Sequence, residues 1–283
     1  MSAAAPRVVV HATARAFRER AEPWLLRAEA EHSLVLGIAA RLIDGHRPAP
    51  FLATVEDAGG VAGVALRTPP HKLLLTRLPP AAIPPLADAV AVRFDALPAV
   101  LGPPEAARAF GREWAGRHGV GAHDGMQQRV FELTRLVPPP RLAPGRARVA
   151  GADDLDTVAA WLAAFEAEVG VTTPSDARAW AERHVGAGDV WLWDDGGPVA
   201  MAAVIARSPT GARVGAVYTP APLRGRGYAS AVVAALSGWL LDGRRRFCSL
   251  YTDLANPTSN GIYLSLGYAP VADALDVVFA PAP

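Results

Sequence analysis

The chain has 283 residues, of which 51% are hydrophobic and 19% charged, a composition that supports folded cores and argues against wholesale disorder. Its 28 basic and 27 acidic residues are interspersed and leave a formal net charge of +1. This balance gives no electrostatic reason to expect nucleic acid or an anionic membrane surface as a partner. The length corresponds to about two ordinary domains.

A single cysteine, Cys248, excludes an intrachain disulfide and a metal site built from several thiolates. The seven histidines lack metal-binding spacings, and no Gly-x-Ser-x-Gly motif accompanies them, so metal and serine-hydrolase chemistry are disfavoured. Residues 1–7 lack the features of a signal peptide, and the longest apolar run, residues 229–241, is too short to cross a bilayer. We therefore expect a soluble, unprocessed cytoplasmic protein without a metal, either monomeric or homodimeric.

The first half of the chain alternates between helical and strand patterns. The predicted elements are helices between residues 12 and 43, strands at 51–56, 61–66 and 73–77, a helix near 82–93, a strand at 98–101, a helix at 104–118 and a strand at 128–136. The segment 79–85, which follows the third of these strands, contains four prolines and no glycine. Because proline lacks a backbone N–H, we expect no phosphate-binding loop in this half.

Prolines at 138–140, followed by Pro144 and Gly145, mark the clearest linker, because such residues do not extend a helix or a central strand. We therefore predict a first domain at 1–138, a linker at 139–145 and a second domain at 146–283.

The second half repeats the order of the first with little retained identity, which predicts a duplicated fold. The pattern first indicates strand 147–150, a helix capped by Asp153 and ending near Glu168, and a helix capped by Ser175 and Asp176 and ending at His184. A meander of three strands follows at 190–194, 199–207 and 213–218. The last elements are a helix from 226 that stops at Gly243, strand 247–252, a helix from Pro257 capped by Asn256, and strand 271–279. The predicted order is β-α-α-β-β-β-α-β-α-β.

Residues 224–230, which we call the anion cradle, lie between the last meander strand and a long amphipathic helix. Gly225 and Gly227 allow successive backbone N–H groups to converge, while Arg224, Arg226 and the positive end of the helix dipole attract negative charge. The pattern predicts a ligand that carries phosphate. The simpler alternative is a tight turn with solvated arginines.

Two motifs in this half resemble those of the GNAT superfamily of acyl-CoA-dependent N-acyltransferases. Arg224-Gly225-Arg226-Gly227-Tyr228-Ala229 matches the family signature Arg/Gln-x-x-Gly-x-Gly/Ala, which follows a strand and binds the pyrophosphate of coenzyme A. Downstream, the family pattern Asn-x-x-Ala/Ser-x-x-x-Tyr-x-x-x-Gly-Phe/Tyr is matched by Asn256, Ser259, Tyr263, Gly267 and Tyr268. The resemblance covers the second half of the chain, from about residue 146 to residue 279, and these two motifs carry it.

The resemblance implies an α/β (α+β) protein of two GNAT-like domains, each a mixed, mostly antiparallel twisted sheet flanked by helices, with the first domain degenerate. It implies acetyl-CoA as cosubstrate and a small-molecule or peptide amine as acceptor. A parallel strand pair that separates beside the cradle would leave backbone groups for the pantetheine arm. The cofactor-binding residues so implied are Val217, Tyr218, Thr219, Arg224, Gly225, Arg226, Gly227, Tyr228, Ala229, Ser230 and Asn256.

The resemblance assigns Tyr263 to the thiolate that leaves when the acceptor amine attacks the thioester. An ordinary tyrosine with a pKa near 10 is a weaker acid than a thiol near 8.5, so full proton transfer is uphill by about 2 kcal/mol. We therefore expect Tyr263 to stabilise the departing sulfur by a hydrogen bond. The candidates for the general base are Glu166 and Glu168, although a solvated helix end explains these two residues equally well.

Several alternatives stay open at this point. Asn256 is also a good helix N-cap, and Tyr263 also fits a core tyrosine. Trp161, Trp180, Trp191 and Trp193 fit core positions better than an acceptor pocket, and Arg244–Arg246 fit a capped helix end better than a ribose-phosphate contact. The resemblance implies an N-acetyltransferase that acts through a ternary complex, with a non-catalytic acyl-CoA sensor or scaffold as the alternative.

Overall fold

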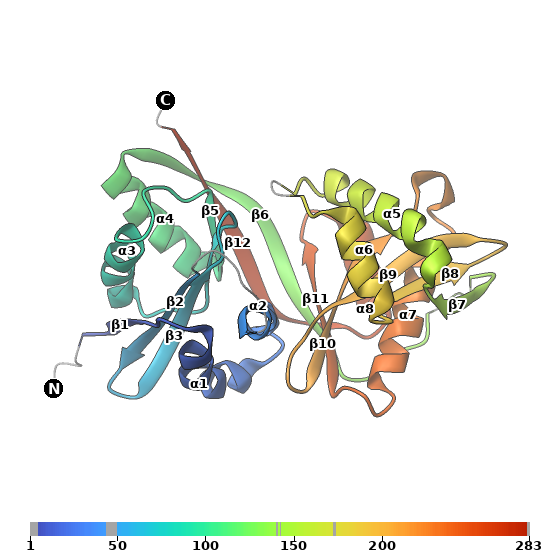
Figure 1. The fold of residues 1–283 in the computed structure, drawn as a ribbon, viewed down its shortest axis with the longest axis horizontal. Helices are drawn as coiled ribbons and strands as arrows, with labels where there is room; N and C mark the ends of the chain where they lie inside the picture. The colour runs from blue at the N-terminus through green and yellow to red at the C-terminus, as the bar shows by residue number, and fades with distance from the viewer. Residues whose placement is uncertain (1–4, 44–49, 140, 142, 172–173, 282–283) are drawn as a thin grey trace. The chain divides into compact units, whose positions relative to one another are not determined.

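A computed structural model describes residues 5–43, 50–139, 141, 143–171 and 174–281. The chain forms two compact units, each with parallel and antiparallel strand pairs and flanking helices (Figure 1). The first unit comprises Met1–Arg129, Asp253–Ala255 and Ala272–Pro283, and the second comprises Val130–Thr252 and Asn256–Val271. The domain boundaries drawn from the proline-rich linker stay a prediction, and positions 140 and 142 of that linker lie outside the described residues.

In the first unit, antiparallel strands β1 to β4 are followed by the parallel pair of β4 and β5, and β5 then pairs with the last strand of the chain, β12. Its elements are β1 (Arg7–Val10), α1 (Ala14–Leu25), α2 (Ser33–Ile43), β2 (Phe51–Asp57), β3 (Gly60–Arg67), β4 (Leu73–Leu75), α3 (Ile83–Ala91), β5 (Ala99–Gly102), α4 (Pro104–His118), and parts of β6 (Val120–Leu133) and β12 (Ala269–Pro281). The sequence did not predict β1, and β6 begins earlier than the predicted residue 128.

Strand alternation gives this unit a core on each face of the sheet. Phe51 belongs to a core cluster with Leu86 of α3 and Phe110 of α4. The next residue, Leu52, belongs to a second cluster with Phe17 of α1 and Leu36 of α2. Because both faces are buried, the strands read as nearly continuous apolar runs.

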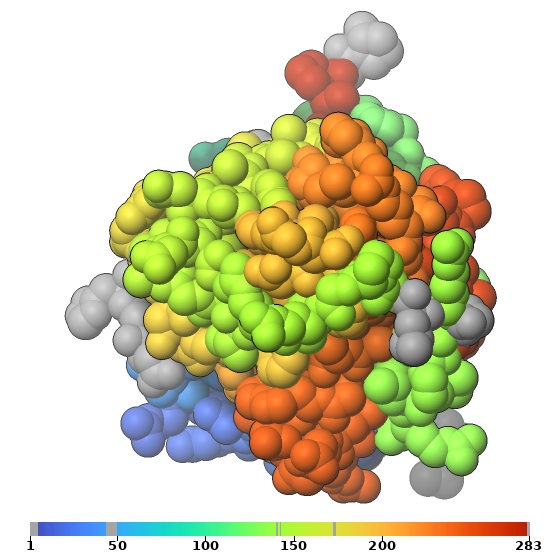
Figure 2. Space-filling view, turned by 90° about the vertical axis from the view of Figure 1, so that its right-hand side faces the viewer, coloured from blue at the N-terminus to red at the C-terminus, as the bar shows by residue number. Residues whose placement is uncertain are grey.

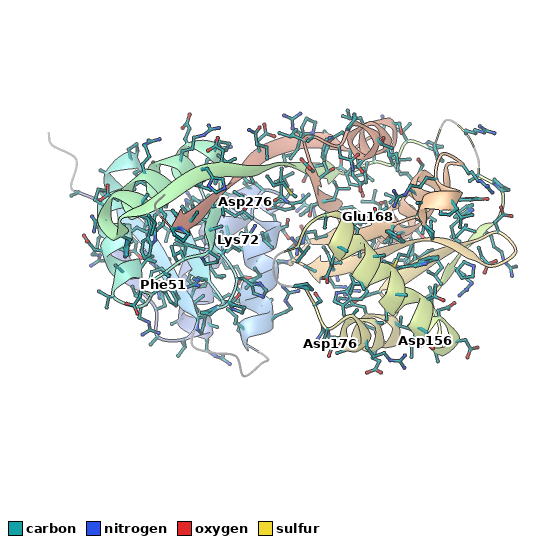
Figure 3. The ribbon with its side chains drawn as sticks, turned by 90° about the horizontal axis from the view of Figure 1, so that it is seen from above. Phe51, Lys72, Asp156, Glu168, Asp176 and Asp276 are labelled. Atoms are coloured by element: carbon teal, nitrogen blue, oxygen red, sulfur yellow. The ribbon has the colours of Figure 1, made fainter. Side chains whose placement is uncertain are left out.

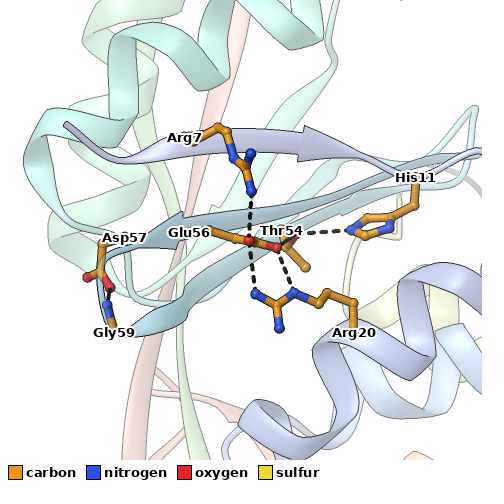
Figure 4. Close-up of polar contacts among 7 residues, drawn as sticks. All are labelled: Arg7, His11, Arg20, Thr54, Glu56, Asp57 and Gly59. Atoms are coloured by element: carbon orange, nitrogen blue, oxygen red, sulfur yellow. Dashed lines mark hydrogen bonds and ion pairs between the residues drawn. The ribbon is translucent and has the colours of Figure 1, made fainter. Parts of the chain in front are cut away.

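A buried carboxylate fastens the first strand and first helix to this sheet (Figure 4). Glu56 accepts hydrogen bonds from Arg20 Nε at 2.8 Å, from Arg7 Nη2 at 3.3 Å and from Thr54 Oγ1 at 3.0 Å. The hydrogen bond from Arg20 is the main reason that the pKa of Glu56 falls to about 2. The Thr54 hydroxyl also lies 3.0 Å from His11 Nε2. The network joins β1, β2 and α1.

In the second unit, antiparallel strands β7 to β10 are followed by β11, which is parallel to β10 and lies next to β6 in the sheet. Its elements are β7 (Arg146–Val149), α5 (Leu155–Glu168), α6 (Ala177–Gly186), β8 (Val190–Asp194), β9 (Pro198–Arg207), β10 (Gly211–Tyr218), α7 (Tyr228–Leu241), β11 (Phe247–Asp253) and α8 (Pro257–Ser265). With β12 this is the predicted order, which is therefore confirmed.

The helices of this unit also divide between the two faces of its sheet: α7 and α8 pack on one face, and α5 and α6 pack on the other. Figure 2 shows the surface of the unit, where the yellow of the meander and the orange of α7 and its neighbours lie side by side. Within the described residues, no helix is long and apolar enough to span a membrane.

The predicted caps are mostly confirmed. Asp176 accepts from Ala179 N at 3.0 Å, and Asn256 accepts from Ser259 N at 3.0 Å. The prediction that Asp153 caps the helix before Glu168 is wrong, because residues 152–154 form a 3₁₀ turn and Asp154 accepts from Gly151 N at 2.8 Å instead. Asp residues adjacent in sequence are equally good candidates for a cap, and only the turn geometry selects between them.

Candidate functional site

The anion cradle leads from β10 into α7 through a turn that needs glycine. Gly225 has φ +77° and Gly227, the N-cap of α7, has φ +84°, both in the left-handed region that is unfavourable for residues with a Cβ. Arg224, Gly225 and Arg226 are exposed. The turn therefore presents two arginines to solvent just before a 14-residue helix.

The backbone donors of the cradle are unused. Within the described part of the chain, the N–H groups of residues 225–230 make no hydrogen bond, and the first bond of the helix is donated by Ala231 N to Gly227 O at 3.0 Å. Unpaired N–H groups at a helix start carry partial positive charge that the helix dipole reinforces. Such an arrangement is suited to bind an anion with several oxygens.

Beside the cradle, β10 separates from β11. In this described region the two strands are in register only where residues 211–213 meet residues 247–249. Beyond that point β10 carries irregularities in its pairing with β9, and Ala216 adopts φ +48°. Val217 and Tyr218 therefore lie on a strand edge that β11 does not cover, as predicted for the parallel pair.

Two predicted site residues contact each other. Arg224 Nη2 lies 2.8 Å from Glu168 Oε1 and 2.7 Å from Oε2, and Arg224 Nε donates to Thr219 O at 2.9 Å. The guanidinium also lies 5.8 Å from the centre of the Tyr218 ring. Both partners of the ion pair are about half exposed, at 48% and 47%. Glu168, labelled in Figure 3, thus holds an arginine of the cradle from the end of α5.

The Tyr228 side chain contacts other residues of the protein and is not available to a ligand. Its ring is buried in the core under α7, and its hydroxyl donates to Asp195 Oδ2 at 2.5 Å. Only its backbone N–H is left for the cradle, beside those of the partly buried Ala229 and Ser230. Asp195 was not predicted, because it lies in a distant turn and no local pattern connects it to the cradle.

Tyr263 lies in the same buried cluster as Tyr228, with 7% of its surface exposed. Its ring lies 6.3 Å from that of Phe131 and 5.8 Å from that of Tyr268 between centroids. Burial raises the pKa of Tyr263 to about 12. Its hydroxyl therefore stays protonated and serves as a hydrogen-bond donor more readily than as an acid.

The other predicted residues have local partners. Asn256 is exposed, caps α8 as described, and accepts at its backbone oxygen from Asn260 Nδ2 at 2.7 Å. Glu166 is 9% exposed, and its Oε2 accepts from Ser175 N at 2.9 Å. In the described structure no contact joins Glu166 or Glu168 to Tyr263. The catalytic set therefore stays a prediction.

The remaining aromatic and basic residues have the structural roles that the sequence favoured. Arg244 Nη1 donates to the backbone oxygens of Trp239 at 3.1 Å and Asp242 at 2.9 Å, and so caps the end of α7. The four tryptophans are partly buried against the two cores: Trp161, Trp180, Trp191 and Trp193. Among the described residues, no group of three or more His, Cys, Asp or Glu side chains is placed to hold a metal.

Comparison with known proteins agrees with this geometry. The model of the family described as FR47-like protein matches residues 192–275, which include the anion cradle, Asn256 and Tyr263. An acetyltransferase of the GNAT family from Colwellia psychrerythraea aligns over 97% of this chain and 100% of its own, with a TM-score of 0.62 and 11% identity. The chain has the GNAT fold.

Two further GNAT structures match along nearly the whole chain. A GCN5-related N-acetyltransferase from Sphaerobacter thermophilus aligns over 98% of this chain and 96% of its own, with a TM-score of 0.60 and 17% identity. A tandem GNAT protein from the clavulanic acid biosynthesis pathway aligns over 98% and 99%, with a TM-score of 0.56 and 16% identity. No curated protein matches the sequence. The predicted GNAT resemblance and the prediction of two GNAT-like domains are confirmed, and at these identities the likeness establishes the fold alone.

Proposed function

We propose that the second unit is an N-acetyltransferase that moves the acetyl group of acetyl-CoA to a primary amine by direct attack in a ternary complex. The observation that carries the proposal is the run of unused N–H groups at 225–230, which lies next to the open edge of β10. The cradle provides donors for a diphosphate, and the backbone of Val217 and Tyr218 provides partners for an amide-containing arm. The GNAT fold supports acyl transfer as the reaction class.

The proposed reaction requires a hydrogen-bond donor near the departing sulfur. The amine attacks the thioester carbonyl and forms the C–N bond, and its proton passes to a base. The tetrahedral intermediate then breaks its C–S bond, and the electron pair of that bond leaves with the thiolate. A tyrosine whose pKa is about 12 would give up its proton to a thiolate, whose conjugate acid has a pKa near 8.5, at a cost of about 5 kcal/mol. Tyr263 therefore stabilises the thiolate by a hydrogen bond while keeping its proton.

The two candidate bases have different surroundings. Glu166 is buried and holds the Ser175 N–H, so its carboxylate has a structural partner. Glu168 is half exposed, and its partner Arg224 belongs to the cradle. We propose that Glu168 couples coenzyme binding to deprotonation of the acceptor amine. When phosphate oxygens of the coenzyme bind Arg224, the Glu168 carboxylate is released and can accept a proton.

The engagement of both carboxylates also favours a second function. A protein that binds acyl-CoA without a working base would act as a sensor or scaffold, and it would keep the cradle with Glu166 and Glu168 as structural residues. Consumption of the thioester separates the two functions, because only the enzyme releases coenzyme A when an amine is added.

The decisive experiment pairs calorimetry of acetyl-CoA binding with an assay of free thiol over a panel of amines. We expect Tyr263→Phe to bind acetyl-CoA with unchanged affinity and to turn over at least about tenfold more slowly, the loss of one hydrogen bond to a charged group. Tyr268→Phe is the matched control, since Tyr268 is a neighbouring buried tyrosine whose hydroxyl bonds Ser237 at 2.8 Å. Equal turnover by both variants would remove Tyr263 from the mechanism, and an absence of acetyl-CoA binding would remove the proposed function.

Glu168→Gln tests the coupling separately. If the carboxylate only restrains Arg224, coenzyme binding tightens and kcat is unchanged; if it is the base, kcat falls and the acidic limb of the pH profile is lost. The proposal predicts tighter coenzyme binding together with a lower kcat and loss of the acidic limb. A variant with unchanged coenzyme affinity and unchanged kcat would refute it.

A further inference from the structure

The first unit contains a cavity of 270 Å³ that is open to solvent and separate from the anion cradle. It lies between α2 and the strands β3, β4 and β5. Its apolar wall is formed by Leu34, Ile38 and Leu42 of α2, with Leu34 and Ile38 only partly buried. All of its lining residues belong to the first unit, so the cavity depends on this unit alone.

The floor of the cavity follows from the register of the sheet. Leu66 of β3 pairs with Leu74 of β4, Leu74 pairs with Leu101 of β5, and all three line the cavity. Residues paired across neighbouring strands project from the same face, so these leucines form one continuous apolar row. In β12 the row ends at Asp276, the partner of Leu101.

The rim of the cavity is basic. Arg41, His71 and Lys72 line it together with Thr68, and among the described lining residues none is acidic. Asp276 Oδ2 accepts from Lys72 Nζ at 2.6 Å, and the two residues are labelled side by side in Figure 3. The Lys72 side chain is 34% exposed and Asp276 only 11%. The buried acid thus fixes the ammonium group at the rim, where further N–H donors remain for a ligand.

We propose that this cavity binds a small aliphatic carboxylate, with the alkyl chain on the leucine row and the carboxylate at the basic rim. A volume of 270 Å³ corresponds to about nine water-sized volumes, which matches a chain of a few carbons and excludes a whole coenzyme. Each methylene group that is buried against the leucine row makes the free energy of binding more favourable. The two permanently charged side chains of the lining, Arg41 and Lys72, are both positive, and this favours an anionic ligand over a cationic one.

The test is calorimetry and NMR titration of the full chain with straight-chain carboxylates from propanoate to decanoate, and with the alcohols of the same length. We expect the Kd to fall about fourfold for each added methylene, the equivalent of 0.8 kcal/mol, until the chain outgrows the cavity. Each alcohol should bind more weakly than its carboxylate by up to about fivefold, the range of a solvent-exposed ion pair. An absence of binding, an affinity independent of chain length, or equal affinity for alcohols would overturn the proposal.

Two variants locate the binding. Ile38→Trp fills the cavity from α2 and should abolish binding, and Arg41→Gln, on the exposed rim, should weaken carboxylates about two- to fivefold while leaving alcohols unchanged. Arg93→Gln is the control, since Arg93 is an exposed arginine of the same unit that does not line the cavity. If Ile38→Trp fails to fold, the carboxylate affinity of Arg41→Gln alone tests the site. Equal carboxylate affinities of Arg41→Gln and Arg93→Gln would refute it. The outcome is independent of acetyl-CoA binding by the second unit.

Discussion

Gly225 offers the sharpest test of the anion cradle, because the other end of the same helix offers a control with the same backbone conformation. Gly225 has φ +77° and Gly243, which follows α7, has φ +71°. A Cβ built on either glycine meets nothing within 4 Å. The substitutions Gly225→Ala and Gly243→Ala therefore introduce the same strain without a clash.

The expected loss of stability is small and equal for the two variants. Placing alanine in the left-handed region costs about 1–2 kcal/mol, and the reduced freedom of the unfolded chain offsets about 0.4–1 kcal/mol of this. The net loss is about 1 kcal/mol, which lowers the melting temperature by about 2–4 °C in a domain of this size. Thermal unfolding followed by circular dichroism measures both shifts.

Only Gly225→Ala should change coenzyme binding. Relief of the strain turns the Gly225 N–H away from the cradle, and a hydrogen bond to a charged group is worth about 1.5–3 kcal/mol. Calorimetry should then show acetyl-CoA bound about 10- to 150-fold more weakly by Gly225→Ala and unchanged by Gly243→Ala. If the two variants bind alike while their melting temperatures fall, the cradle does not bind the coenzyme through its backbone.

Three further predictions concern stability and reactivity. The pKa of Glu56 is lowered to about 2, chiefly by the hydrogen bond from Arg20, so its stabilising effect is complete above about pH 4.5 and is lost as the pH falls towards 2. Because Arg20 is 48% exposed, we expect Glu56→Gln to lose about 1 kcal/mol at pH 7 and only a small part of that at pH 2 in urea unfolding, and an equal loss at both pH values would contradict this. Tyr268→Phe should lose about 1–3 kcal/mol by leaving the buried Ser237 hydroxyl unpaired, and the same change in a Ser237→Ala background should cost less. Cys248 is fully buried and burial raises its pKa to about 12, so a thiol reagent at pH 8 should label it only after unfolding; rapid labelling of the native protein would refute its placement.

The sequence predicted the parts of the fold that local patterns determine. The glycines of the cradle, the Asn256 and Pro257 start of α8, and the alternation in the meander each have a local physical cause, and each lies where it was predicted. Strand β1 was missed because its four residues carry too short a pattern, and its place in the sheet depends on pairing with β2, more than 40 residues away in the chain.

The contacts between distant segments could not be predicted, and they matter most at the site. Residues 168 and 224 were both candidates, yet nothing in either segment indicates that the carboxylate of one holds the guanidinium of the other. The same holds for Asp195 and the Tyr228 hydroxyl. A single sequence gives residue types and local spacing, whereas these pairs depend on how α5 and the meander pack around α7.

The two units share one topology but differ in the turn that enters the corresponding helix. In each, a parallel strand pair is linked through a helix, β4–α3–β5 in the first unit and β10–α7–β11 in the second. The second unit enters its helix through Gly225 and Gly227, which leaves the donors of the first turn unpaired. The first unit enters α3 through the 3₁₀ turn at residues 80–82, and the first turn of α3 itself contains prolines at 84 and 85, which have no N–H to offer. The strand arrangement is shared, and the identity of the few residues that begin the helix decides whether an anion has donors to bind.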